Sequence, residues 1–184
     1  MFRLVLTSFC FLYASLIFAS STESEDEFQW SVDKFDAGTV IASTPGYVMY
    51  GDKLRVRVVS GGCDYGQLWT SIYTIPPKGT DPAVFKNKKV TARFMGQKME
   101  FPVMHAGEFL LGYLVMLDMG VYELDTLSRI LSSEEELKMD YIDSVEFKSK
   151  DYLDIPFNSW STKGLGRAIK KAAKECSLLN TQIG

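Results

Sequence analysis

Histidine and cysteine are scarce in this chain of 184 residues, and their scarcity limits the chemistry it can carry out. There are one histidine, His105, and three cysteines, without a C-x-x-C, H-E-x-x-H or D-x-D-x-D-G pattern, so no metal site is predicted. The glycine-rich patterns that hold phosphates and the G-x-S-x-G pattern of hydrolases are absent as well. The sequence therefore predicts no cofactor and no catalytic residue.

An excess of positive charge is also lacking. The 20 lysines and arginines are outnumbered by 23 aspartates and glutamates, which gives a formal net charge of −3 and a pI near 5.3. This balance argues against a nucleic-acid partner, which requires a basic domain. With 46% hydrophobic residues the chain can bury one core, and neither a collagen-like nor a wholly disordered class fits its composition.

The chain has one long apolar run, over residues 4–18, and it is shorter than the roughly 20 residues that a membrane-spanning helix needs. Arg3 precedes the run and small residues at 19–21 follow it, as in a secretory signal peptide that is cleaved before Thr22. We therefore expect a signal peptide at 1–21, an acidic spacer at 22–27 and a single globular domain at 28–184. The mature protein would be exported, periplasmic or secreted, without a transmembrane segment.

Signal cleavage removes Cys10 and leaves two cysteines, Cys63 and Cys176. Two cysteines in an exported chain most simply form one disulfide. For a closed loop of about 100 residues, the chain-entropy estimate of the stabilisation is about 4.7 kcal/mol. We therefore predict a structural disulfide, which leaves no free thiol to act with His105.

Most of the domain has the sequence pattern of β-strands. Residues 53–58 alternate between cationic and apolar side chains, and residues 90–104 predict a hairpin around Gly96. Residues 108–118 predict one long buried strand. Short strands are expected at 145–147 and 153–157, the latter at a sheet edge because it contains Pro156.

Two segments of the C-terminal half predict helices. Asp125 is positioned to cap a short helix near 125–133, and Ser161 and Thr162 to cap a helix near 162–178. The second helix has a continuous apolar stripe that includes Cys176, so the disulfide would fix it to the sheet. The predicted fold class is α+β, with a mainly antiparallel sheet, sandwich-like or curved, and the C-terminal helix packed on it.

The cations are grouped although the chain is acidic. The candidate basic binding residues are Lys53, Arg55, Arg57, Lys86, Lys88, Lys89, Arg93, Arg167, Lys170, Lys171 and Lys174. A shared basic face would bind an acidic protein or an anionic surface of the cell envelope, whereas solvated faces spread around the molecule are the alternative. Tyr65 and Trp160, both expected in loops, are candidate aromatic contacts because Tyr and Trp are enriched at interface hot spots.

The C-terminal third resembles a known family. A helix at 127–131 and a strand at 137–141 precede a segment in which Ser161, Lys163, Gly164, Leu165 and Ala168 match an S-L-K-G-F-x-x-A-like motif. In this part the chain is similar to exported proteobacterial proteins of the invasion-associated locus B type. The resemblance implies an extracytoplasmic, non-enzymatic accessory or host-interaction protein of a Gram-negative bacterium.

These observations favour an exported, disulfide-stapled module that binds another protein, as an accessory factor, an inhibitor or a virulence-associated interactor. Exposure of Tyr65 and Trp160 on one face would support it. One alternative is a hydrolase acting on cell-wall or surface glycans, whose sign would be two facing carboxyl groups in a cleft with a raised pKa. Another is a carrier of a small molecule or lipid, whose sign would be an internal apolar cavity.

Overall fold

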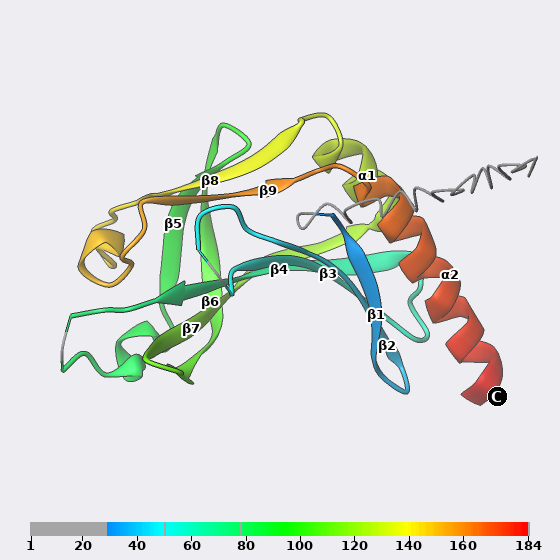
Figure 1. Ribbon diagram of the computed structural model, residues 1–184, viewed down its shortest axis with the longest axis horizontal. Coiled ribbons are helices and arrows are strands. Elements are labelled where there is room, and N and C mark those ends of the chain that lie inside the picture. Colours follow the sequence, from blue (N-terminus) through cyan, green and yellow to red (C-terminus); the bar gives the residue numbers. More distant parts are fainter. Residues whose placement is uncertain (1–28, 50, 78, 184) are drawn as a thin grey trace, which may run out of the picture.

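A nine-stranded antiparallel sheet makes up most of the molecule, and two α-helices lie in its C-terminal half (Figure 1). The computed structural model describes residues 29–49, 51–77 and 79–183, with side chains up to Thr181. The expected signal peptide and acidic spacer lie outside these residues. The predicted α+β class with a mainly antiparallel sheet is confirmed. None of the described helices combines the length and the apolar character that crossing a membrane requires.

The strands do not follow one another in space in their chain order. The sheet has the order β1-β2-β3-β4-β7-β6-β5-β8-β9. The elements are β1 (Ser31–Asp36), β2 (Thr39–Pro45), β3 (Lys53–Val59), β4 (Tyr65–Thr74), the 3-10 helix η1 (Pro82–Phe85), β5 (Lys89–Phe94), β6 (Gln97–Phe109), β7 (Gly112–Glu123), α1 (Leu124–Leu131), β8 (Glu136–Ile142), the 3-10 helix η2 (Ser149–Asp151), β9 (Phe157–Ser161) and α2 (Leu165–Ile183).

The sheet curls until the end of β2 meets the last strand. Gly46 forms an isolated antiparallel bridge with Trp160 on β9, and the backbone N–H of Tyr47 donates to the carbonyl of Ser159 at 2.9 Å. We call this junction the seam. The strand expected at 153–157 is wrong, because residues 153–156 form a loop; β9 begins after Pro156 and is the last strand in the order. The strand expected at 145–147 is absent from this described segment, which is a loop that leads into η2.

Alternating residues of the strands form the core inside the curl. On β3, Leu54, Val56 and Val58 have no exposed surface, as their alternation with cationic residues predicts. The C-terminal helix α2 packs against β1, β2 and β3 and extends five residues beyond its predicted end. Of its predicted apolar stripe, Leu165, Ile169, Ala172 and Cys176 are buried and Ala173 is half-buried; Ala168 and Leu179 are buried as well.

The single strand predicted at 108–118 is wrong, because the chain reverses direction inside it. Strand β6 ends at Phe109 and β7 begins at Gly112, so that Leu110 and Leu111 form a two-residue turn. Gly112 passes so close to β4 that a Cβ atom there would lie 2.3 Å from the carbonyl oxygen of Thr74. The close approach of two strands therefore requires glycine at this position and fixes where the hairpin turns.

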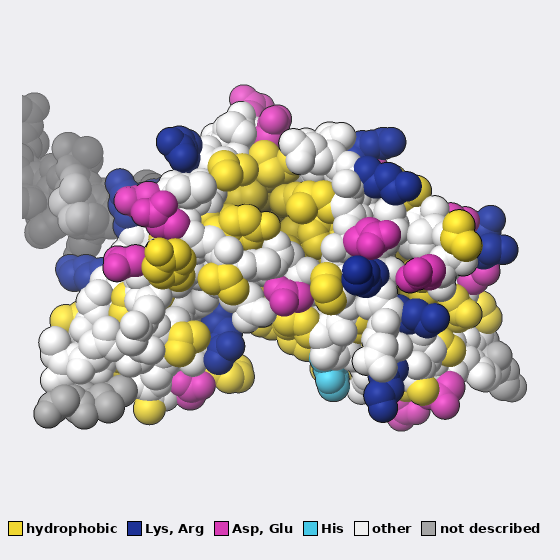
Figure 2. All heavy atoms as spheres, turned by 180° about the vertical axis from the view of Figure 1, so that it is seen from behind, with side chains coloured by type: hydrophobic (Ala, Val, Ile, Leu, Met, Phe, Trp, Pro, Cys, Tyr) yellow, Lys and Arg dark blue, Asp and Glu magenta, His cyan; other side chains and the backbone are white. Residues whose placement is uncertain are grey.

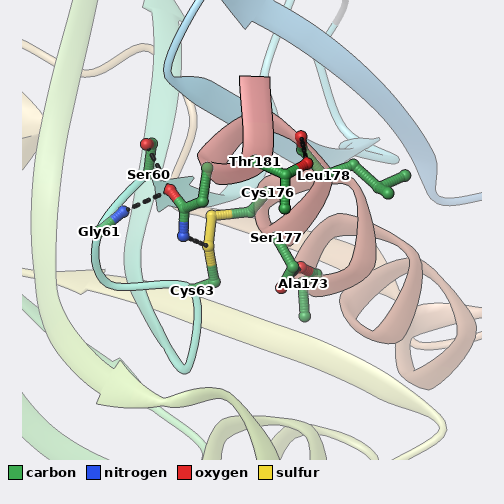
Figure 3. Close-up of a disulfide and its surroundings, with 9 residues drawn as sticks. Ser60, Gly61, Cys63, Ala173, Cys176, Ser177, Leu178 and Thr181 are labelled. Atoms are coloured by element: carbon green, nitrogen blue, oxygen red, sulfur yellow. Dashed lines mark hydrogen bonds between the residues drawn. A yellow bond between two sulfur atoms is a disulfide. The ribbon is translucent and has the colours of Figure 1, made fainter. Parts of the chain in front are cut away.

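The predicted disulfide joins Cys63, in the turn between β3 and β4, to Cys176 on α2 (Figure 3). The Cα atoms of the two cysteines are 5.7 Å apart. Next to it, the side chain of Asn180 accepts hydrogen bonds from the hydroxyl of Ser60 and the N–H of Gly61, and its amide donates to the sulfur of Cys63 at 3.3 Å. The bond and this polar cluster hold the last turns of α2 against the sheet.

Candidate ligand pocket

An apolar pocket lies between the curled sheet and α1. It has a volume of about 280 Å³ and is open on one side. Strands β4, β5, β6 and β7 and helix α1 all contribute to its wall, through Leu68, Phe94, Met95, Gln97, Met99, Phe101, Met119, Tyr122, Leu127, Ile130 and Leu131. Figure 2 shows the molecule from behind, with left and right exchanged relative to Figure 1. Hydrophobic side chains gather at its upper centre, in the region between α1 and the β5–β6 hairpin.

The chemistry of the wall suits an uncharged, apolar ligand. Among the described residues, no charged side chain lines the pocket. The Tyr122 hydroxyl donates to the carbonyl of Met119 at 2.7 Å, which leaves Gln97 to supply the polar side-chain group at the mouth. Three methionines lie in the wall, and their flexible thioethers adapt to ligands of irregular shape. An apolar cavity of about 150 Å³ takes up benzene, so this one has room for a molecule about twice that size.

One of these methionines lies in a tight turn at the wall of the pocket. Met95 and Gly96 form the two-residue turn between β5 and β6, and both have positive φ, at 49° and 77°. Glycine and asparagine adopt such angles easily, whereas methionine does so at a cost. Behind the turn, the rings of Phe94 and Phe101 pack edge to face with their centroids 6.4 Å apart and form the floor of the pocket.

The structure does not bring the three predicted groups of cations onto one face. Strand β5 lies on the left of Figure 1 and helix α2 on the right. On β3, Lys53 and Arg57 are exposed, whereas Arg55 is half-buried, with its guanidinium 4.4 Å from the centroid of the Trp69 ring. Burial lowers the pKa of Arg55 to about 10. The remaining candidates are all exposed: Lys86, Lys88 and Lys89 before and at the start of β5, Arg93 within it, and Arg167, Lys170, Lys171 and Lys174 along α2.

The two candidate aromatic contacts lie in different environments. Tyr65, at the start of β4, is 57% exposed. Trp160 has no exposed surface, because it belongs to β9 and points into the core rather than lying in a loop as expected. Trp160 therefore offers nothing to a partner, and the joint exposure that would have supported a protein-binding face does not occur.

One carboxyl group, that of Asp52, has the raised pKa that the hydrolase alternative requires. Burial raises the pKa of Asp52 to about 7, the charge of Asp154 adds to this rise, and the Tyr73 N–H and Arg55 oppose it. Asp52, however, has no exposed surface, and its two oxygens accept hydrogen bonds from the backbone N–H of Tyr73 and the side-chain amide of Asn158. A glycan cannot reach this carboxyl, so the group has a structural role.

Comparison with known proteins adds no relative. No family model, no curated protein and no solved structure matches the chain. The assignment of a role therefore depends on the geometry of the chain itself. Sequence reasoning missed the pocket because its residues come from five elements that are far apart along the chain. The one local signal was Met95-Gly96, where a methionine stands at the first position of a tight turn.

Proposed function

We propose that the protein is an exported carrier that binds a small, uncharged apolar molecule between α1 and the sheet. The observation that supports this most is the pocket of about 280 Å³, in whose described wall no side chain is charged. Clefts of about 300 Å³ and more, lined by apolar side chains with few polar groups, are typical of small-molecule sites. The ligand class is a short acyl or alkyl chain or a molecule with one or two rings.

Export is supported by two features. The disulfide between Cys63 and Cys176 persists in an oxidising compartment, and residues 1–21 have the pattern of a signal peptide. We infer that the mature protein acts in the periplasm or is secreted, and that it does so without catalysis.

The test uses the oxidised protein without residues 1–21 and the uncharged fluorophore N-phenyl-1-naphthylamine. We expect saturable binding at one site, with an increase in fluorescence, and displacement of the dye by decanol. Because hydrocarbon cannot solvate a carboxylate, decanoate at pH 8 should displace the dye less well than decanol. Absence of saturable binding would refute the proposal.

A blocking variant shows whether the dye occupies this pocket. Ile130 lies at the mouth and is 43% exposed, so Ile130→Trp should close the pocket without disturbing the core. The matched control is Leu178→Trp on α2, where the side chain is 51% exposed and lies outside the pocket. We expect at least a tenfold loss of dye affinity for Ile130→Trp and none for Leu178→Trp.

A second candidate function is that of an accessory module that binds an acidic protein partner. The observation that favours it is the row of exposed cations on α2, where Arg167, Lys170 and Lys174 recur at helical spacing on the side that faces away from the sheet. Lys171 is less available, since its ammonium lies 3.8 Å from the carboxylate of Glu175. The test is affinity purification from the exporting cell: Lys170→Glu with Lys174→Glu should abolish capture of a stoichiometric partner that the wild type releases at high salt.

A further inference from the structure

The turn between β6 and β7 places apolar side chains in water at the end of a rigid hairpin. Leu110 is 80% exposed, Leu111 is 90% exposed, and Phe109 beside them is 45% exposed. Ile75, which follows β4, is 54% exposed and leads into Pro76 and Pro77. A small hollow lined by both prolines, Leu110 and Leu111 joins the two loops, which lie together at the lower left of Figure 1. We call Ile75, Phe109, Leu110 and Leu111 the apolar tip.

The backbone of the apolar tip is strained as well. Leu110 has a φ of 52°, in the region that leucine rarely adopts, at the first position of a two-residue hairpin turn. Glycine, asparagine or aspartate ordinarily occupies such a position. The chain thus carries an unfavourable backbone conformation and two exposed leucines at one place. Strain and exposure that coincide indicate a binding role, because neither serves the stability of the fold.

The apolar tip is held firmly from behind. The ring of Phe109 packs edge to face on Tyr73 with centroids 6.2 Å apart, and the hydroxyl of Tyr113 donates to the carbonyl of Thr80. The backbone N–H of Ile75 donates to the carboxylate of Asp154 at 3.1 Å. Docking of such a preformed tip requires little additional ordering of the chain.

We propose that the apolar tip anchors the protein at the surface of a lipid bilayer. Leu110 and Leu111 form the turn at the very end of the hairpin, and fluid hydrocarbon accepts exposed apolar side chains without a matching pocket. The ladder pairing of Phe109 with Gly112 closes the hairpin backbone directly behind the turn, as insertion into hydrocarbon requires. The rings of Phe109, Tyr73 and Tyr113 lie behind the two leucines, farther from the end of the hairpin. Aromatic rings favour the boundary between hydrocarbon and headgroups.

Two carboxylates of described residues lie beside the apolar tip and bear on the kind of lipid it prefers. The carboxylate of Glu108 is exposed next to the turn, and that of Asp154 lies at Ile75. Negative groups at this depth would be repelled by anionic headgroups. The preferred surface is therefore a zwitterionic bilayer, and this anchoring is independent of the ligand pocket, which lies at the opposite end of β6.

The experiment is flotation of the oxidised mature protein with phosphatidylcholine vesicles in a density gradient. The wild type should float with the vesicles, and admixture of phosphatidylglycerol should lower the bound fraction. Leu110→Gly combined with Leu111→Ser should reduce the vesicle affinity at least tenfold, since each leucine contributes about a tenfold gain on burial. The same variant should have an unchanged or higher unfolding temperature, because glycine relieves the positive φ.

Two controls assign the result to the apolar tip. Phe35→Ser removes an aromatic side chain that is 72% exposed on β1, and this variant should still float. The pocket variant Ile130→Trp should also float, so failure of the carrier proposal would leave the anchoring intact. The proposal is overturned if the wild type stays in the soluble fraction, if the double variant floats equally well, or if the leucines instead hold two copies together during gel filtration.

Discussion

Asp52 and Asn158 connect the loop between β2 and β3 to the last strand of the curled sheet through a buried hydrogen bond. Asp52 ends the loop between β2 and β3, and one of its carboxyl oxygens accepts from the side-chain amide of Asn158 on β9. The other oxygen accepts from the backbone N–H of Tyr73 on β4, and both Asp52 and Asn158 have no exposed surface. One buried carboxyl thus connects three segments at the seam.

This arrangement predicts that stability depends on pH through Asp52. Burial raises its pKa from 3.8 to about 7, so the folded protein keeps this proton up to a higher pH than the unfolded chain. The stabilisation is fully present below about pH 4 and is lost as pH rises to about 7, a change of about 4 kcal/mol at 1.4 kcal/mol per unit. The measurement is urea unfolding of wild type and Asp52→Asn between pH 4 and pH 8.

The difference in unfolding free energy between these two proteins isolates the contribution of Asp52 from that of other titrating groups. We expect the wild type to lose unfolding free energy relative to Asp52→Asn as pH rises, and the difference to level off above pH 8. Because the carboxyl is buried, 0.5 M NaCl should leave the trend in place. A difference that stays constant from pH 4 to pH 8 would show that Asp52 titrates normally.

Gly46 is predicted to stabilise the seam because it has no Cβ atom. A Cβ atom on Gly46 would lie 2.7 Å from the Oδ1 atom of Asn158, whose side chain is already held by Asp52. We expect Gly46→Ala to lower the unfolding free energy by about 1–3 kcal/mol, as overpacking of a buried site does. Gly38→Ala is the control, because a Cβ there meets Ser60 at an ordinary 3.6 Å. Equal stability of the two variants in urea unfolding would contradict this account.

Local sequence patterns predicted the elements that pack against near neighbours. The alternation around Leu54 has a period of two residues, the apolar stripe of α2 has a period of 3.6, and Gly96 marks the turn of a hairpin. The cysteine pairing followed from elimination, since two cysteines remain if the expected signal peptide is removed. These predictions needed no knowledge of the strand order.

Local sequence patterns did not predict the contacts between segments that are far apart along the chain. The seam joins residues near Gly46 to residues near Trp160, and no local sequence pattern predicts that pairing. The turn at Leu110 was missed for a different reason, because leucines in a turn look like the interior of a strand. Sequence signals for turns are glycine, asparagine and proline, and the chain uses none of them at those two positions.

The disulfide is predicted to control the stability of α2. Its reduction should lower the unfolding free energy by about 2–5 kcal/mol, as removal of a native disulfide from a secreted domain does. Because Cys176 lies in the second half of α2, amide exchange should accelerate most in this half of the helix. The checks are urea unfolding and hydrogen exchange of Cys63→Ser with Cys176→Ser. The oxidised mature protein should react with no thiol reagent when unfolded, and two reactive thiols would disprove the bond.

Met95 is predicted to lower the stability of the fold while it contributes an apolar side chain to the wall of the pocket. Its φ of 49° precedes Gly96, so Met95→Asn would create Asn-Gly, the preferred pair for a two-residue hairpin turn. We expect the unfolding free energy to rise by up to about 1 kcal/mol, because strain is relieved. The same change removes an apolar side chain from the wall of the pocket, so the affinity for N-phenyl-1-naphthylamine should fall. A variant that gains stability and keeps its dye affinity would show that Met95 has no part in binding, whereas a loss of stability would show that the turn is not strained.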